Sequence, residues 1–270
     1  MVDNHKLQQK ANWVRRQAVD LVMKTKKGHI GGAFSCTDIL VGLYYGGLFR
    51  LNSKEPSWSY PHRDRFILSK GHACIALYPI LKDLGFISIE ELNSFCSDGS
   101  RLFNHPDNAI RGIEVSTGSL GNGFGVGVGI ALAGKMDRRS YKTIVLLGDG
   151  ECYEGVVWEA AQFAGHCKLN NLIAIVDRNK QCVTDFTYDC NCLEPFEDKW
   201  KAFNWETMVI DGHSFDDILS IKNVSNKPLV VIANTIKGKG VSFMEKQLNW
   251  HHGIPTEQEL SIIEKELPWI

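Results

Sequence analysis

Residues 143–179 contain the feature that most constrains the fold, which is two buried-strand patterns separated by one helical pattern. Residues 143–148 are apolar and rich in β-formers, and residues 172–176 repeat this pattern. The segment between them has an apolar face at helical spacing, made of Val156, Val157, Ala160, Ala161, Phe163, Ala164 and Cys167. These periodicities predict a β-α-β unit.

Polar residues follow both strands of this unit. Gly148-Asp149-Gly150 ends the first strand, and Asp177-Arg178-Asn179 ends the second. Because the carboxyl ends of parallel strands meet at the edge of a sheet where ligands bind, we expect Asp149 and Asn179 to lie close together. A carboxylate and an amide oxygen suit Mg²⁺ or Ca²⁺. An aspartate in this position can equally close a tight turn or cap the next helix, so the residues alone leave both interpretations open.

Two further strand patterns, at 206–210 and 229–234, and a short one at 64–68 alternate with helical segments. This alternation over residues 1–270, with no linker-like change in composition, predicts a single α/β domain with a doubly wound, mainly parallel sheet flanked by helices. Helices are expected at 5–25, 36–48 (with Ser35 or Thr37 as N-cap), 73–84, 200–204, 215–221 (with Ser214 as N-cap) and 256–264. Two more are expected, a short one that starts at Ser88 and one that follows residues 115–123 and ends at Lys135.

Glycine-rich and polar stretches predict the irregular parts of the chain. Residues 28–32 contain three glycines and are expected to form a loop, and residues 51–62 and 180–199 are expected to be loops as well. Gly121, Gly125 and Gly129 recur every four residues, which predicts a helix face that packs closely on a neighbour. The spacing does not match a dinucleotide-binding fingerprint.

Composition excludes several classes of function. A formal net charge of −1 over 270 residues gives no reason to expect nucleic acid or an anionic membrane as a partner. The first residues lack a signal-peptide core, so a cytoplasmic location is expected. The eight cysteines are expected to be free thiols, and Cys190 and Cys192 are the only pair close enough in sequence to consider for metal or redox chemistry. No second pair completes a zinc site.

Three histidines lie in loops marked by glycine or proline, namely His29, His72 and His105. A histidine taken at random is more often structural than catalytic. Three histidines in loops that can reach the same edge of a sheet favour a catalytic role over a structural one. The expected role is proton transfer, for which imidazole is suited near neutral pH. The absence of a Gly-x-Ser-x-Gly sequence disfavours a serine hydrolase.

Six motifs in family order resemble the diphosphate-binding domain of transketolases, which use thiamine diphosphate. They are GHIGG (28–32), DRFILSKGHA (64–73), NHPD (104–107), GIEVSTGSLGNG (112–123), GDGECYEG (148–155) and TIKGKG (235–240). The resemblance covers most of the chain. It implies transfer of a two-carbon ketol unit from a ketose, phosphorylated or otherwise anionic, to an aldose through a dihydroxyethyl intermediate on the cofactor.

The resemblance also implies roles for individual residues. Asp149, the Asn179 side chain and the main-chain carbonyl of Gln181 would bind Mg²⁺ or Ca²⁺, although the residues around Gln181 depart from the common family pattern. The residues implied in cofactor binding are His72, Gly118, Leu120, Gly150, Glu154 and Asn179, with Glu154 in a carboxylate network between subunits. His29, His72 and His105 would serve catalysis, and so would His252 or its neighbour His251.

Transketolases are more than twice this long, and the absent part binds the aminopyrimidine ring of the cofactor. The resemblance therefore implies a chain that is active only with a separate pyrimidine-binding subunit, in an α2β2 heterotetramer acting on sugar phosphates. Two alternatives stay open. One is another thiamine-diphosphate enzyme, of the deoxyxylulose-phosphate synthase or 2-oxoacid decarboxylating type, and the other is a non-catalytic cofactor-binding remnant.

Overall fold

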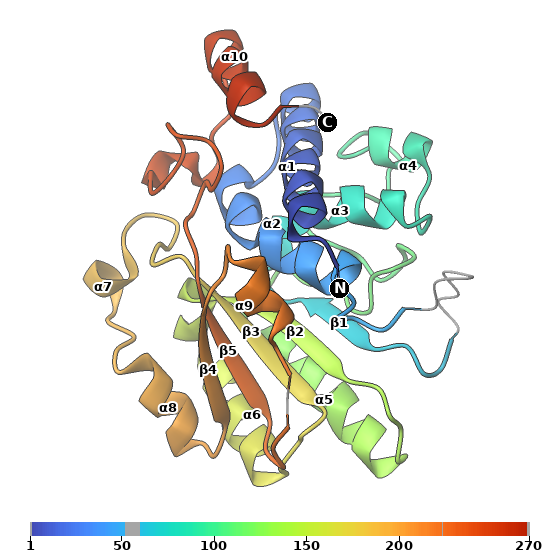
Figure 1. The fold of residues 1–270 in the computed structure, drawn as a ribbon, viewed down its shortest axis with the longest axis vertical. Helices are drawn as coiled ribbons and strands as arrows, with labels where there is room; N and C mark the ends of the chain where they lie inside the picture. The colour runs from blue at the N-terminus through green and yellow to red at the C-terminus, as the bar shows by residue number, and fades with distance from the viewer. Residues whose placement is uncertain (1, 52–59, 223, 269–270) are drawn as a thin grey trace.

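The computed structural model describes residues 2–51, 60–222 and 224–268, and its centre is a parallel sheet of five strands (Figure 1). The strands are β1 (Arg65–Leu68), β2 (Thr143–Gly148), β3 (Leu172–Arg178), β4 (Glu206–Asp211) and β5 (Leu229–Asn234), in the spatial order β1-β2-β3-β5-β4. Every neighbouring pair is parallel. The predicted parallel α/β sheet is confirmed.

Both faces of the sheet are covered, which explains why its inner strands are apolar without alternation. Ile144 and Leu146 of β2 pack into one core with α1 (Asn4–Thr25), α2 (Ile30–Tyr45), α3 (Cys74–Asp83) and α9 (Phe215–Leu219). Val145 and Leu147 pack into the other core with α5 (Asn122–Met136), α6 (Gly155–His166) and α8 (Phe196–Ala202).

The remaining short elements are α4 (Ile89–Asn93), α7 (Thr187–Cys190), α10 (Glu257–Glu266) and the 3₁₀ turns Gly71–Ala73, Gly150–Tyr153 and Leu248–His251. The N-caps predicted at Ser88 and Ser214 are confirmed. Among the described residues, no helix combines the length and the apolar character needed to cross a membrane.

The second helix begins earlier than predicted. It starts at Ile30, so Gly31 and Gly32 are helical and the predicted loop over 28–32 is wrong beyond residue 29. A Cβ on Gly31 would lie 2.7 Å from the Trp250 carbonyl oxygen, so the glycine permits a close approach of two backbones. Ser35 is no N-cap either, because its hydroxyl donates to the Gly32 carbonyl within the helix.

Other local expectations are also corrected. Residues 180–199 are not one loop, because they contain α7 and the first residues of α8. The buried ring of Phe196 anchors the first turn of α8. This helix covers 196–202, so it begins and ends earlier than the helix predicted at 200–204. Phe163 is 46% exposed, so the buried face of α6 is narrower than predicted. The loop predicted at 51–62 lies largely outside the described residues.

The glycines of α5 do not form the close-packed face predicted from their spacing. Gly121 is the N-cap residue, and a Cβ on Gly129 would have no atom within 4 Å. The close contact is instead at Gly127, where a Cβ would lie 2.5 Å from Val145 Cγ2 of β2. Helix periodicity alone cannot tell these positions apart, because which face meets the sheet depends on tertiary packing.

This difference gives a matched pair of substitutions in one helix. Gly127→Ala is expected to lower the free energy of unfolding by about 1–3 kcal/mol because the added methyl overpacks the contact with Val145. Gly129→Ala is expected to raise it by about 0.5–1 kcal/mol, since alanine is the better helix former and the space is open. Urea unfolding followed by circular dichroism measures both. Equal effects of the two substitutions would contradict this packing of α5.

Candidate active site

The carboxyl ends of β2 and β3 bring Asp149 and Asn179 together, as the sequence predicts. One carboxylate oxygen of Asp149 accepts a hydrogen bond from the Gly150 amide at 2.8 Å, and the other accepts one from the Lys180 amide at 2.6 Å. The Asn179 side-chain oxygen accepts a hydrogen bond from the Gln181 amide at 3.1 Å. The 3₁₀ turn after β2 and the loop after β3 thus hold their polar groups at one point of the sheet edge.

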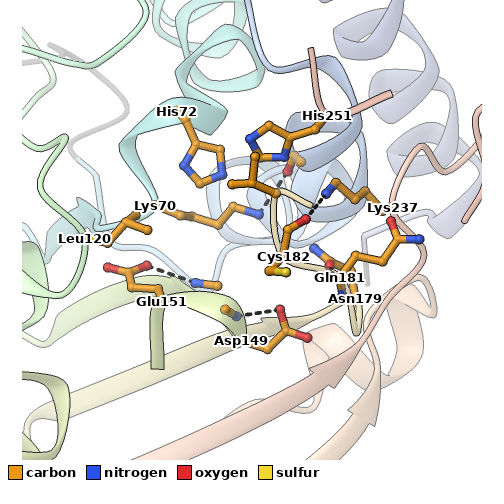
Figure 2. A pocket seen from close by; sticks show the side chains of 14 residues that line it. Lys70, His72, Leu120, Asp149, Glu151, Asn179, Gln181, Cys182, Lys237 and His251 are labelled. Atoms are coloured by element: carbon orange, nitrogen blue, oxygen red, sulfur yellow. Dashed lines mark hydrogen bonds between the residues drawn. The ribbon is translucent and has the colours of Figure 1, made fainter. Parts of the chain in front are cut away.

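A pocket opens beside these residues (Figure 2). It contains about 500 Å³ of space not filled by protein atoms, part of it open to solvent. Its lining includes six residues predicted for the site, which are His72, Leu120, Asp149, Gly150, Asn179 and Gln181. Figure 2 shows the imidazoles of His72 and His251 on one side of the pocket and the Asp149 carboxylate on the opposite side.

Burial makes the charged form of the Asp149 carboxylate unfavourable unless a cation lies beside it. The residue is 2% exposed, and this burial, together with the nearby Asp177 carboxylate, raises the pKa of Asp149 to about 7. A bound divalent cation would favour the charged form. Asn179 lines the same pocket and brings its side-chain oxygen, a second oxygen donor, to this edge of the sheet. This set of hard oxygen donors fits Mg²⁺ or Ca²⁺.

Two lysines that the sequence patterns do not single out face the same pocket. The Lys70 ammonium pairs with the Asp177 carboxylate and donates to the Gly32 carbonyl at 3.0 Å, and both charged residues are at most 1% exposed. Asp177 also accepts from Ser35 at 2.5 Å and from Thr235. Burial alone would lower the pKa of Lys70, but the Asp177 carboxylate raises it above the usual lysine value. Lys70 is therefore a fixed positive charge in the pocket wall.

The second lysine, Lys237, follows β5. Its ammonium donates to the Cys182 carbonyl at 2.8 Å. Burial and the nearby Lys70 charge lower the pKa of Lys237 to about 8. Lys70 and Lys237 both line the pocket that contains Asp149, so two ammonium groups face an anionic ligand there, one of them already paired with Asp177. A lysine directly after a strand, as at position 70, is the signal in the sequence that points to such a role.

The pocket's other carboxylate, Glu151, binds protein groups. It accepts hydrogen bonds from the Ser69 hydroxyl at 2.5 Å, the Gly121 amide at 2.8 Å and the Gly148 amide at 3.0 Å. These contacts join the ends of β1 and β2 to the start of α5. The role of Glu151 is therefore to stabilise the wall of the pocket.

Five histidines form a cluster centred on His29, and two of them, His72 and His251, line the pocket. The ring centroid of His29 lies 5.2 Å from that of His72, 5.9 Å from His105, 5.3 Å from His251 and 4.1 Å from His252. The sequence alone leaves His251 and His252 as alternatives, and the structure brings both to the cluster. His251 lines the pocket, while His252 is exposed.

Four histidines of this cluster have lowered pKa values. Burial, with the neighbouring His252 and His105, lowers the pKa of His29 to about 4, and burial with Lys237 lowers the pKa of His251 to about 3. Burial also lowers the pKa of His72 and of His105. The Nδ1 atoms of His29 and His251 are buried with no hydrogen-bond partner among the described residues. A neutral imidazole can accept a proton at its unprotonated nitrogen and donate a hydrogen bond from its N–H.

This neutrality can be measured directly. The nitrogen shifts of the His29 and His251 imidazoles are expected to stay constant from about pH 8 to about pH 5, because their pKa values lie well below the ordinary value of about 6.5. The unfolded chain binds more protons than the folded one below pH 6.5, so these groups reduce stability as the pH falls toward 4. Long-range ¹H–¹⁵N spectra, assigned with His29→Asn and His251→Asn, give the midpoints. A midpoint near 6.5 for either ring would disprove the neutral cluster.

Two of the predicted cofactor-binding residues, Gly118 and Glu154, do not line the pocket that contains Asp149. A Cβ on Gly118 would lie 3.4 Å from His105 Cγ, which places this glycine beside the histidine cluster. Glu154 is exposed and precedes α6 as its N-cap residue. The Gly150 amide, for its part, is directed at the Asp149 carboxylate.

Comparison with known proteins identifies the family of this site. Residues 6–269 match the family described as the transketolase thiamine diphosphate binding domain. The chain belongs to the transketolase family. It is 44% identical over 262 residues to one of the subunits of an apulose-4-phosphate transketolase from Phocaeicola vulgatus, and the match covers 96% of this chain and 92% of that protein.

Other transketolases are similar in sequence or structure. One of the subunits of a 6-deoxy-6-sulfo-D-fructose transketolase, from a Clostridium species, is 43% identical over 257 residues, covering 93% of this chain and 92% of that one. The crystal structure of the transketolase from Campylobacter jejuni superposes with a TM-score of 0.91 at 32% identity, covering 98% of this chain and 43% of that one. The chain thus spans less than half the length of that transketolase.

The pocket fits the cofactor that gives the family domain its name. A diphosphate is a polyanion, and the pocket offers the ammonium groups of Lys70 and Lys237 as well as the side-chain oxygens of Asp149 and Asn179. Oxygen donors on one side and cations on another are what a magnesium diphosphate requires.

Proposed function

We propose that this chain is the diphosphate-binding subunit of a two-subunit transketolase. It would transfer a two-carbon ketol unit from an anionic ketose to an aldose. The observation that carries the proposal is a single pocket lined by a buried carboxylate, Asp149, by the ammonium groups of Lys70 and Lys237, and by His72 and His251 of the histidine cluster. This arrangement combines a site for a metal diphosphate with groups able to handle sugar hydroxyl protons.

The chain's own residues would hold the cofactor as follows. Asp149, the Asn179 side-chain oxygen and the Gln181 main-chain carbonyl would bind Mg²⁺, and Lys70 and Lys237 would neutralise the remaining phosphate charge. Leu120, which lines the pocket, would supply an apolar contact, and Gly150 would leave room beside the phosphates. Thiamine diphosphate, when bound, supplies a carbanion that attacks the carbonyl of the ketose and stabilises the charge left by carbon–carbon cleavage.

The histidines would act on the sugars. His29, His72, His105 and His252, with His251 beside them, form the cluster that adjoins the pocket, where the hydroxyl groups of a sugar can reach them. Because most of these rings are neutral, each can take a proton from one sugar hydroxyl at its unprotonated nitrogen and donate a hydrogen bond to another oxygen from its N–H. The free Nδ1 atoms of His29 and His251 are the positions we assign to this transfer.

A second subunit completes the proposed enzyme. The chain spans 43% of the Campylobacter jejuni transketolase, and two relatives that it covers almost end to end are named as transketolase subunits. The partner would bind the aminopyrimidine ring and activate the cofactor, and we place the two chains in an α2β2 assembly. Glu154, exposed at the start of α6, would lie between the subunits.

The substrate would be an anionic sugar. One relative is named for apulose 4-phosphate and another for 6-deoxy-6-sulfo-D-fructose, so a phosphate and a sulfonate both occur among the substrates in these names. The five-histidine cluster favours sugar hydroxyl chemistry over decarboxylation of a 2-oxoacid.

The proposal is tested by an assay of ketol transfer. The purified chain is supplied with thiamine diphosphate, Mg²⁺, a ketose phosphate and an aldose phosphate, first by itself and then with increasing amounts of the pyrimidine-binding partner. No turnover is expected from either chain by itself, and activity should saturate at a one-to-one ratio. Full activity of this chain without the partner would refute the split enzyme, and a mixture that decarboxylates pyruvate but transfers no ketol unit would refute the transketolase reaction.

A further inference from the structure

The loop after β3 brings two thiols together at the edge of the pocket. The sulfur atoms of Cys182 and Cys190 lie 2.9 Å apart. The sequence predicts free thiols and offers Cys190 and Cys192 only as the pair closest in sequence, whereas the fold brings Cys182 and Cys190 together because the chain folds back between residues 181 and 186. Gln181 and Phe186 form an antiparallel bridge, and the Thr187 amide donates to the Lys180 carbonyl at 3.0 Å.

The two cysteines link the pocket to the protein surface. Cys182 is half-buried and lines the pocket beside Asp149, whereas Cys190 is exposed at the end of α7. The Cys182 backbone is fixed on both sides, since its carbonyl accepts from Lys237 at 2.8 Å and its amide donates to the Asp185 carbonyl at 2.9 Å. The thiols are therefore held next to each other by a folded segment.

We propose that Cys182 and Cys190 form a reversible disulfide at the edge of this pocket. A disulfide has its sulfur atoms about 2.05 Å apart, so the thiols need to approach by only about 1 Å. Both are free thiols in this structure, and the exposure of Cys190 gives a small oxidant access. Cys192, also exposed and only two residues away, is not part of the pair.

The chemistry is a two-electron oxidation with a peroxide as oxidant. One thiol, as its thiolate, attacks a peroxide oxygen, the oxygen–oxygen bond breaks, and a sulfenic acid forms with release of hydroxide. The thiolate of the second cysteine attacks that sulfur, the sulfur–sulfur bond forms, and a second hydroxide leaves. The two protons of the thiols convert both hydroxides to water. A dithiol reductant reverses the reaction by thiol–disulfide exchange.

The test uses the full chain and hydrogen peroxide. Oxidation of the wild type is expected to remove two of the eight titratable thiols, and dithiothreitol should restore them. Cleavage before Asp185 and Asp189 separates the two cysteines, so mass spectrometry should find residues 177–184 joined to the fragment that starts at Asp189, with the loss of two hydrogen atoms. Cys192→Ser should behave like the wild type, whereas Cys182→Ser and Cys190→Ser should lose the link.

A link between Cys190 and Cys192, or only unlinked sulfenic or sulfinic acids, would overturn the proposal. A second measurement connects the pair to the pocket and rests on the proposed function. Thiamine diphosphate with Mg²⁺ should slow disulfide formation at least about fivefold, because Cys182 lines the space that the cofactor would fill. If the disulfide formed at the same rate with and without cofactor, the Cys182–Cys190 disulfide would still be supported, but the proposed position of the cofactor in this pocket would be contradicted.

Discussion

Replacing Lys70 by methionine is expected to lower the free energy of unfolding by about 3–5 kcal/mol, because breaking a buried ion pair leaves a charge without compensation. Asp177, the partner of Lys70, is fully buried, and its remaining side-chain donors, the Ser35 and Thr235 hydroxyls and the Asn179 amide, carry no charge. Methionine keeps most of the volume of the lysine side chain, so the decrease in the free energy of unfolding reports the loss of the ammonium charge. Urea unfolding followed by tryptophan fluorescence measures it.

The control for this substitution is Lys239→Met. Lys239 pairs with Glu245 at 3.6 Å, but both side chains are about one-third exposed, so the expected loss is at most about 1 kcal/mol. The double variant Lys70→Met with Asp177→Asn should recover part of the stability lost in Lys70→Met. Similar losses for Lys70→Met and Lys239→Met would show that the buried pair does not organise the edge of the sheet.

Replacing Asp149 by asparagine is expected to weaken binding of thiamine diphosphate with Mg²⁺ at least about 100-fold, since loss of the residues that merely support metal ligands already costs about 10- to 100-fold. The fold itself should not lose stability. The Asp149 carboxylate is 2% exposed, and its pKa is raised to about 7, so its charge is unfavourable while no cation is bound.

Isothermal titration calorimetry measures the affinity, and thermal unfolding without cofactor measures the stability. Asp189→Asn is the matched control, since Asp189 is exposed on α7 in the same loop and is expected to leave both quantities unchanged. If Asp149→Asn bound the cofactor as tightly as the wild type, Asp149 would be a structural cap and not a metal ligand.

The centre of the fold could be predicted from the sequence because its signals are local. The strands β2 and β3 are continuous apolar runs, and the parallel connection between them requires that Asp149 and Asn179 meet at one edge. The loops that carry His29 and His72 lead to the same edge, so the histidine cluster followed from the same reasoning.

The parts that could not be predicted depend on contacts between distant segments. Gly31 leaves no room for a side chain because the Trp250 backbone approaches it, a contact that no pattern within residues 28–32 can reveal. The role of Lys70 depends on Asp177, 107 residues away along the chain. The Cys182–Cys190 pair depends on a reversal of the chain between them, whereas sequence distance favours Cys190 and Cys192.

A crystal structure of the two-subunit complex with thiamine diphosphate and Mn²⁺ in place of Mg²⁺ would locate the metal site. Anomalous scattering locates the manganese ion without reference to any assumed role. We expect one strong peak within coordination distance of the Asp149 carboxylate, the Asn179 side-chain oxygen and the Gln181 main-chain carbonyl, with the diphosphate beside Lys70 and Lys237. A peak among His29, His251 and His252 instead, or a diphosphate bound away from this pocket, would contradict the account.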